Sequence, residues 1–385
     1  MLGKKYSLIN LLVFFLIWRA FLFIPLYFGQ IALAYRQHQE YTNLWYYTKP
    51  YPPVNHFFLY PLANFDGVHY LNIAGNGYND NGRFLPLYPF LIRLTSQIFG
   101  QGEAFGWQLF FAGVFLSHLF LVLSLIVFYK LVRLDFSPQI SFWSGVFLLL
   151  FPTAFFFTAI YSESLFLFLS LLSFYLARKK HWFGASICGM LLTVTRLPGI
   201  SIFFALLIEL FTQKKEKSLK IIYLFFIPLG ILSYAWYNWK KWADPLYFIH
   251  AHAQLGNSRA VTNLVFIPQT LYRYAKMLLS VPTNQFEWWT AFLEVTFFFI
   301  VVLLLFEAWR KKIRLAYIVF SLLCFLLPAF SGTFSGLPRY AIILFPIFIA
   351  LALFKSSKIK IALVLVFSFL SFLLLMFFSR GYFIA

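Results

Sequence analysis

Residues 9–28 read INLLVFFLIWRAFLFIPLYF, and this stretch decides the fold class. About 20 consecutive, mostly apolar residues are what an α-helix needs to cross the hydrocarbon of a bilayer. Lys4 and Lys5 precede the run, which places the N-terminus on the cytoplasmic side because loops there are rich in basic residues. The run is too long for a signal peptide and lacks a small-residue cleavage site, so we expect a retained span.

The composition extends this interpretation to the whole chain. Of the 385 residues, 62% are hydrophobic and 11% are charged, whereas a soluble domain is about half apolar and about a quarter charged. The sequence therefore predicts an all-α, multi-pass membrane protein. The net charge of +19 does not indicate nucleic acid as a partner, because Lys and Arg gather in short gaps between apolar runs. Cys188 and Cys324 show neither metal-site spacing nor a disulfide framework.

The apolar runs predict about eleven crossings. The predicted spans are about 9–28, 108–129, 140–159, 163–177, 182–194, 198–211, 221–239, 289–309, 313–330, 340–354 and 359–378. Clusters of Lys and Arg lie in the gaps between alternate spans, which is the pattern expected of cytoplasmic loops. Pro198 and Gly199 disfavour an unbroken helix, so we expect a hairpin of short or broken helices near residues 182–211.

Two long segments, 29–106 and 240–288, interrupt the apolar pattern and fall on the external side. We interpret residues 1–385 as a single transmembrane domain with short helices lying along the membrane surface in these segments. Most of the 12 acidic residues belong to the external side. Chemistry that uses a carboxylate is therefore expected there.

Residues 64–78, NFDGVHYLNIAGNGY, contain the first candidate carboxylate, Asp66. If the segment is helical, Asp66, His69 and Tyr70 share one face, because they are three and four positions apart. The alternative is that Asp66 only caps a short interfacial helix, since Asp is a preferred N-cap residue. Spacing alone supports the two interpretations equally.

Glu163, in the stretch YSES at 161–164, is the second candidate. A simple N-cap with an acidic first turn is one interpretation, and a functional carboxylate beside hydrocarbon is the other. Arg83, Arg196 and Arg339 lie at external ends of apolar runs. Three such residues meeting in one place would suit a phosphate, although Arg196 could also extend its side chain to the interface.

Four stretches resemble, in order, the motifs of the PIG-V family. They are FDGVHYLNIAGNGY (65–78), RFLPLYPFLIR (83–93), FPTAFFFTAIYSESLF (151–166) and SGLPRYAIILFPIF (335–348), and the closing GYFIA (381–385) is also similar. Phe65 departs from the Trp that is usual in the first motif. Enzymes of this family add the second mannose in GPI-anchor synthesis, and they and their prokaryotic relatives belong to the GT-C membrane glycosyltransferases.

The resemblance implies a GT-C fold and an inverting transfer of a hexose, most often mannose, from a polyprenyl or dolichyl phosphate donor. It implies that Asp66 is the general base. It assigns substrate binding to His69, Tyr70, Arg83, Tyr88, Tyr161, Glu163, Arg196, Arg339 and Tyr340. The sequence has no Asp-x-Asp pair and no Gly-rich nucleotide loop after a strand, so we expect neither a metal nor a cofactor.

The acceptor is left open as a glycolipid, a glycan or a protein. The active site is expected on the external or lumenal face, in the plasma membrane of a prokaryote or the endoplasmic reticulum membrane of a eukaryote. The alternative function is a membrane transporter or lipid flippase. It would require ionisable residues near mid-bilayer and repeated halves, and the sequence shows few of the former and no repeat.

Overall fold

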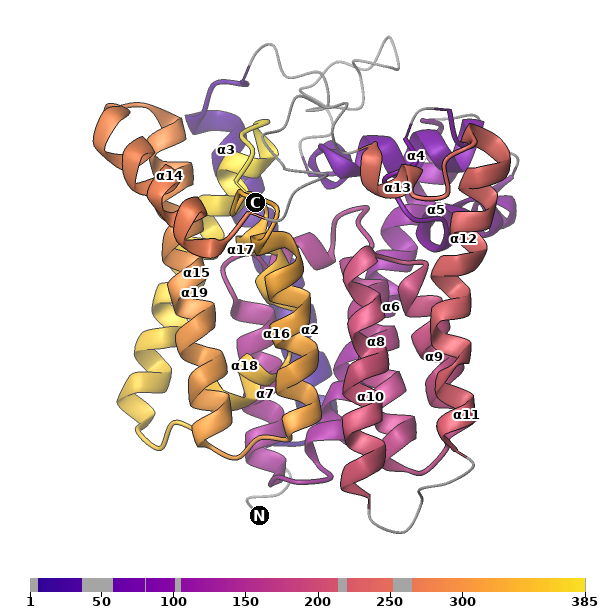
Figure 1. Ribbon diagram of the computed structural model, residues 1–385. Helices are drawn as coiled ribbons and strands as arrows, with labels where there is room; N and C mark the ends of the chain where they lie inside the picture. Colours follow the sequence, from indigo (N-terminus) through magenta and orange to yellow (C-terminus); the bar gives the residue numbers. More distant parts are fainter. Residues whose placement is uncertain are drawn as a thin grey trace.

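The computed structural model describes residues 6–36, 58–79, 81–100, 105–213, 220–251 and 265–384. These residues are almost wholly helical (Figure 1). Their α-helices are α2 (Leu8–Phe21), α3 (Phe23–Ala32), α4 (Asp66–Asn76), α5 (Leu87–Ser96), α6 (Trp107–Val132), α7 (Pro138–Leu150), α8 (Glu163–Arg178), α9 (Trp182–Thr193), α10 (Ser201–Thr212), α11 (Ile221–Leu224), α12 (Phe226–Trp242), α13 (Tyr247–His250), α14 (Ile267–Ser280), α15 (Phe286–Arg310), α16 (Leu315–Ala329), α17 (Leu337–Tyr340), α18 (Pro346–Ala352) and α19 (Ser357–Ser379). The predicted all-α class is confirmed.

Five helical segments among the described residues are long and apolar enough to cross a membrane. They are Leu8–Ala32, Trp107–Val132, Ile221–Trp242, Phe286–Arg310 and Ser357–Ser379. Shorter apolar helices lie between them, at Pro138–Leu150, Trp182–Thr193, Leu197–Thr212 and Leu315–Ala329. The chain therefore has the architecture of a multi-pass membrane protein, and the number of eleven crossings stays a prediction.

Two predicted spans differ from the helices observed. The run 140–159 is helical only to Leu150, because Pro152 lacks an amide hydrogen and the chain continues through the 3-10 helix η4 (Ala154–Phe157). The run 340–354 is divided into α17, the 3-10 helix η7 (Ala341–Ile343) and α18, which begins at Pro346. These irregular stretches adjoin Glu163 and Arg339, so each break changes the direction of the chain near a candidate site residue.

The predicted broken hairpin is confirmed. Helix α9 ends at Thr193, the 3-10 helix η5 covers Leu197–Ile200, and α10 follows directly. A Cβ atom at Gly199 would lie 2.4 Å from the carbonyl oxygen of Leu192, so only glycine permits this approach of the two pieces. Arg196 has an extended backbone at the break, between the two helices.

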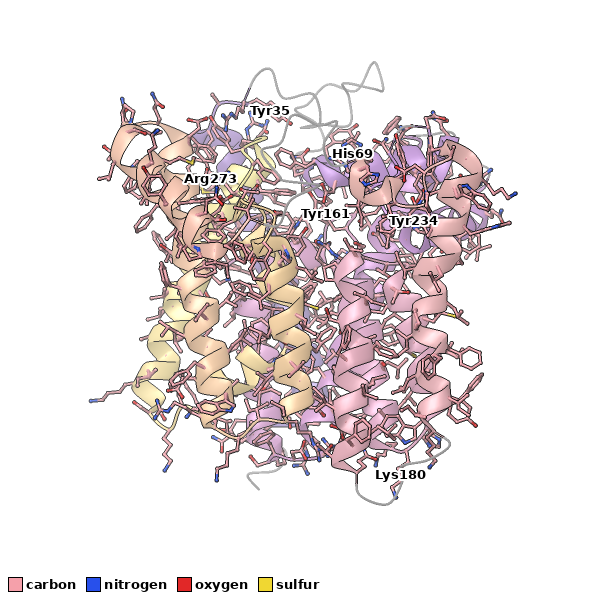
Figure 2. All side chains as sticks on the ribbon, in the orientation of Figure 1. Tyr35, His69, Tyr161, Lys180, Tyr234 and Arg273 are labelled. Carbon is pink, nitrogen blue, oxygen red and sulfur yellow. The ribbon has the colours of Figure 1, made fainter. Side chains whose placement is uncertain are left out.

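The core lies among α6, α7, α8 and α18, in which α6 packs against α7 and α8, and α7 packs against α18. Its largest fully buried side chains are mostly phenylalanines, including Phe128, Phe147 and Phe166. One end of the bundle carries α4, α5, α13 and α14 together with the C-terminus, and the N-terminus lies at the opposite end (Figure 1). His69 and Tyr161 are at the first end and Lys180 is at the second (Figure 2).

An ion-pair network joins the helices at the end where Lys180 lies. Arg178 of α8 donates two hydrogen bonds to Asp135, at 2.6 and 2.8 Å. Arg314 lies 3.3 Å from Asp135 and 3.1 Å from Glu209, whose side chain is buried in α10. This network connects α8, α10, the start of α16 and the turn after α6.

Candidate active site

Asp66 begins α4 at the end of the bundle that carries the short surface helices. The N-cap position belongs to Phe65, whose φ of 57° reverses the chain just before the helix. The Asp66 carboxylate does not serve as the cap; its Oδ2 accepts a hydrogen bond from Nη1 of Arg339 at 2.6 Å. The Asp66 side chain is 24% exposed, so it is only partly buried. The capping interpretation is therefore wrong for Asp66.

Arg339 also contacts a second carboxylate. Its Nε lies 3.3 Å from Oε1 of Glu163, the first residue of α8. The same oxygen accepts a hydrogen bond from Nη1 of Arg196. Ser162 occupies the N-cap position, and Arg196 also lies 3.5 Å from its hydroxyl oxygen. The carboxylates of Asp66 and Glu163 and the guanidinium groups of Arg196 and Arg339 thus form one continuous charged cluster.

Arg83 approaches the cluster from the other side of Asp66. Its Nη2 lies 3.2 Å from Nε2 of His69, and because arginine only donates, this imidazole nitrogen accepts. The His69 ring stacks on Phe84 at 4.9 Å between centroids, and the Arg83 guanidinium lies over the same ring. The hydroxyl group of Tyr234 donates to the carbonyl oxygens of Gly82 at 2.7 Å and Phe84 at 3.3 Å. Contacts from α12 therefore fix the backbone on both sides of Arg83.

Tyr340 contacts the cluster directly, and Tyr70 is connected to it through Ser162. The Tyr70 hydroxyl group shares a 2.8 Å hydrogen bond with Ser162. The Tyr340 ring lies 4.9 Å from the guanidinium carbon of Arg196 and 5.6 Å from that of Arg339. Both arginines can gain cation–π stabilisation from this ring.

Tyr88 and Tyr161 lie behind the charged groups. Tyr88 is fully buried, its hydroxyl group bonds to Ser117 at 2.7 Å, and its ring packs edge-on against Tyr70. Tyr161 is also buried and donates to the carbonyl oxygen of Asn64 at 2.8 Å. Because their hydroxyl groups already have protein partners, both residues are better placed to support the cluster than to bind a substrate.

The pKa values of Asp66 and His69 are both shifted by their surroundings. Burial by itself would raise the pKa of Asp66, but the charges of Arg339, Arg83 and His69 and the hydrogen bond from Arg339 lower it to about 2. Burial lowers the pKa of His69 and Arg83 lowers it further, to about 4, although Asp66 acts in the opposite direction. At neutral pH, Asp66 is therefore a carboxylate and His69 is uncharged.

The cluster consists of two arginines paired with two carboxylates. Within the described part of the chain, no group of three or more His, Cys, Asp and Glu side chains could bind a metal ion. The positive charge comes from arginines instead. Ser162, Phe84 and Tyr234 were not predicted as site residues. Ser162 could have been chosen from the YSES stretch, whereas the contacts of Phe84 and Tyr234 leave no pattern in the sequence.

The model of the mannosyltransferase (PIG-V) family matches residues 8–257. This range includes Asp66, His69, Glu163 and Arg196, whereas Arg339 lies beyond it. A comparison with curated proteins gave no match.

Two crystal structures of the oligosaccharyltransferase of Archaeoglobus fulgidus are similar to this chain. The form tethered to an acceptor peptide is 14% identical with a TM-score of 0.42, over 82% of this chain and 51% of that one. The apo form is 12% identical with a TM-score of 0.45, over 96% and 56% of the two chains. This chain thus spans about half the length of those structures.

Proposed function

The chain belongs to the mannosyltransferase (PIG-V) family, and from this premise we propose that it is a membrane glycosyltransferase. It transfers a hexose, most often mannose, from a polyprenyl or dolichyl phosphate donor to a hydroxyl group of an acceptor. The acceptor is a glycolipid, a glycan or a protein, and membrane lipid surrounds the protein. The observation that carries the proposal is the continuous cluster of Asp66, Arg339, Glu163 and Arg196.

The charge of the cluster, taken together with Arg83 beside it, supports a phosphodiester donor. The guanidinium groups of Arg196 and Arg339 balance the two carboxylates, and Arg83, which contacts His69, adds a single positive charge. A sugar linked to lipid through one phosphate carries a single negative charge and neutralises this excess. A sugar nucleotide has two phosphate charges and would leave a negative excess. Arginine forks also match the oxygens of a phosphate.

The proposed reaction is a single displacement. The acceptor oxygen forms a bond to C1 of the sugar on the face opposite the phosphate, and the bond from C1 to the phosphate oxygen breaks, so the anomeric centre inverts. The acceptor proton passes to Asp66 as general base. The phosphate leaves with one more negative charge, which Arg196 and Arg339 stabilise.

In the proposal, the ion pair of Asp66 with Arg339 explains how a weakly basic carboxylate becomes a general base. A pKa of about 2 makes Asp66 a poor base while Arg339 donates to it. When the donor phosphate accepts hydrogen bonds from Arg339, that stabilisation of the carboxylate weakens and the pKa of Asp66 rises. The base is thus strengthened only when the donor is bound.

Glu163 has a separate role in the proposal. Its Oε1 contacts both Arg196 and Arg339, whereas among the described residues its buried Oε2 has no hydrogen-bond partner. A buried carboxylate oxygen without a partner is costly, and a hydroxyl group of the donor sugar would satisfy it. His69, in contact with Arg83, would orient the acceptor or the departing phosphate.

The site lies at the end of the bundle opposite Lys180 and the N-terminus (Figures 1 and 2). Because basic loops are cytoplasmic, the active site faces the outside of a prokaryotic plasma membrane or the lumen of the endoplasmic reticulum.

The direct test compares two donors with the purified protein in lipid nanodiscs. Labelled polyprenyl-phosphate mannose should give labelled product with an inverted anomeric centre, and a water-soluble mannose nucleotide should give none. Transfer from the nucleotide alone would overturn the proposed donor. Movement of the lipid donor across a liposome membrane, with no product formed, would instead favour the transporter or flippase.

A further inference from the structure

A short segment after α19 packs on the turn that precedes Asp66. The chain reverses at Gly381, whose φ is 80°, while the amide groups of Gly381 and Tyr382 donate to the carbonyl oxygens of Phe378 and Phe377. This reversal brings Phe383 edge-on against Phe65, with 5.2 Å between the ring centroids. We refer to residues 380–384 as the return segment.

Phe65 is in a conformation that needs support. Its φ of 57° is unfavourable for any residue with a side chain, and such a conformation persists only where the surroundings determine it. The Phe65 ring is buried between Phe383 and Phe378, whose centroid is 5.7 Å away. The direction of Asp66, the next residue, depends on this conformation.

The backbone next to Phe65 is bonded to the same part of the chain. The side-chain amide of Asn64 donates to the carbonyl oxygen of Phe378 at 3.0 Å. Tyr161, whose ring lies under Arg339, donates to the carbonyl oxygen of Asn64. The turn before Asp66 is thus connected to α19 on one side and to the charged cluster on the other.

The return segment is itself fixed to the first membrane span. Arg380 donates to the carbonyl oxygen of Leu33 at 3.0 Å and to the side chain of Gln30 at 2.7 Å. Its carbonyl oxygen accepts from the amide of Arg36 at 3.0 Å. Phe383 therefore packs against Phe65 from a segment that is itself held by hydrogen bonds to the end of the first membrane span.

We infer that the return segment is a positioning element of the active site, in which Phe383 stabilises the conformation of Phe65 and thereby directs the Asp66 carboxylate toward Arg339. The inference rests on the proposed function of Asp66 and adds Phe383 and Phe65 as positioning residues. Neither residue contacts the substrate in this scheme.

The test is a double-mutant cycle on turnover with polyprenyl-phosphate mannose. Phe383→Ala should lower kcat by about tenfold to a hundredfold with KM for the donor little changed, because a misplacement of about 1 Å can cost about a hundredfold. Phe383→Tyr, which keeps the ring, should restore most of kcat. Phe65→Gly allows the positive φ without a ring, so adding Phe383→Ala to Phe65→Gly should change kcat no further.

Phe369→Ala is the matched control, because Phe369 lies on α19 outside the return segment and its side chain is exposed. It should leave kcat within about twofold of the wild type, since residues without shared partners act independently. Thermal unfolding and size-exclusion profiles establish that each variant is folded. If the effects of Phe65→Gly and Phe383→Ala multiply, or if Phe369→Ala is as slow as Phe383→Ala, the inference is wrong. An active Asp66→Asn variant would instead show that the proposed role of Asp66 has failed.

Discussion

The carboxylate of Asp66 lies 2.6 Å from the guanidinium group of Arg339, although 273 positions separate the two residues in the chain. The pair unites the two parts that a phosphate-leaving transfer needs, a proton acceptor and a cation. In the proposed reaction the two parts compete, because each hydrogen bond that Arg339 would give to a donor phosphate is one it no longer gives to Asp66. The proposal thereby links binding of the donor and activation of the base through one side chain.

Replacing Asp66 by Asn should abolish most turnover. The amide has the size of the carboxylate but cannot accept the acceptor proton, and loss of general base catalysis typically costs about a hundredfold to ten-thousandfold. Initial rates with labelled polyprenyl-phosphate mannose measure the effect. Asp244→Asn is the control, because Asp244 is an external aspartate that bonds to His250 outside the cluster. Near-normal turnover of Asp66→Asn would contradict the assignment.

Arg339→Lys should raise KM for the donor more than KM for the acceptor. Lysine retains the charge but lacks the planar fork with which Arg339 reaches both Asp66 and Glu163. We expect at least a tenfold rise, about 1.4 kcal/mol of binding free energy, from initial rates at varied donor concentration. Arg310→Lys, at an exposed ion pair with Glu307, should leave both constants unchanged. An equal rise for donor and acceptor would mean that Arg339 does not bind the phosphate.

Glu163→Gln should destabilise the fold as well as slow the reaction. It leaves Arg196 and Arg339 buried beside an uncharged group, and removing one member of a buried ion pair costs about 3–5 kcal/mol. The exposed pair of Glu307 and Arg310 offers the comparison, because Glu307→Gln should cost only about 0.2–1 kcal/mol. Denaturation in detergent micelles measures both. Equal losses of stability in Glu163→Gln and Glu307→Gln would show that the buried Glu163 pairs stabilise the fold no more than an exposed ion pair does.

His69 should make the protein less stable at mildly acidic pH. Its pKa is about 4 in the folded protein and about 6.5 in an unfolded chain. Between these values the unfolded chain binds a proton that the folded protein does not, so the free energy of unfolding falls as the pH falls through this range. Melting temperatures at pH 7.5 and pH 5 should therefore differ less in His69→Gln than in the wild type. The exposed His181→Gln variant should retain the wild-type difference, and an unchanged difference in His69→Gln would refute the prediction.

The membrane spans were predictable from the sequence because the length of an apolar run alone determines whether a helix can cross a bilayer. The broken hairpin was predictable because Pro198 and Gly199 act locally. The runs at 140–159 and 340–354 were predicted as complete spans because their composition stays apolar after the helix ends. Buried irregular backbone, such as that around η4, has the same hydropathy as a helix.

The residues of the candidate site could be chosen from the sequence, but the contacts between them could not. Asp66, Glu163, Arg196 and Arg339 are few enough, and unusual enough beside hydrocarbon, to be chosen individually. The structure brings these four together, while their roles in a reaction stay predictions. Which arginine contacts which carboxylate depends on packing between α4, α8, η5 and α17, and no local pattern records it. The contact of Phe383 with Phe65 likewise depends on packing and leaves no local pattern in the sequence.

The residues of the charged cluster lie far apart in the sequence. The order in which they are synthesised therefore determines the order in which their ion pairs can form. Glu163 enters the membrane before any of its partners, and Arg196 follows it by 33 positions, so this pair can form while α8 and the hairpin of α9 and α10 are being inserted. Asp66 must wait for Arg339, which the ribosome supplies only after most of the later helices. A nascent chain stalled between residues 200 and 330 would thus hold a neutralised Glu163 and an Asp66 that has not yet met Arg339, and the proposed transfer activity would begin only after Arg339 has been synthesised.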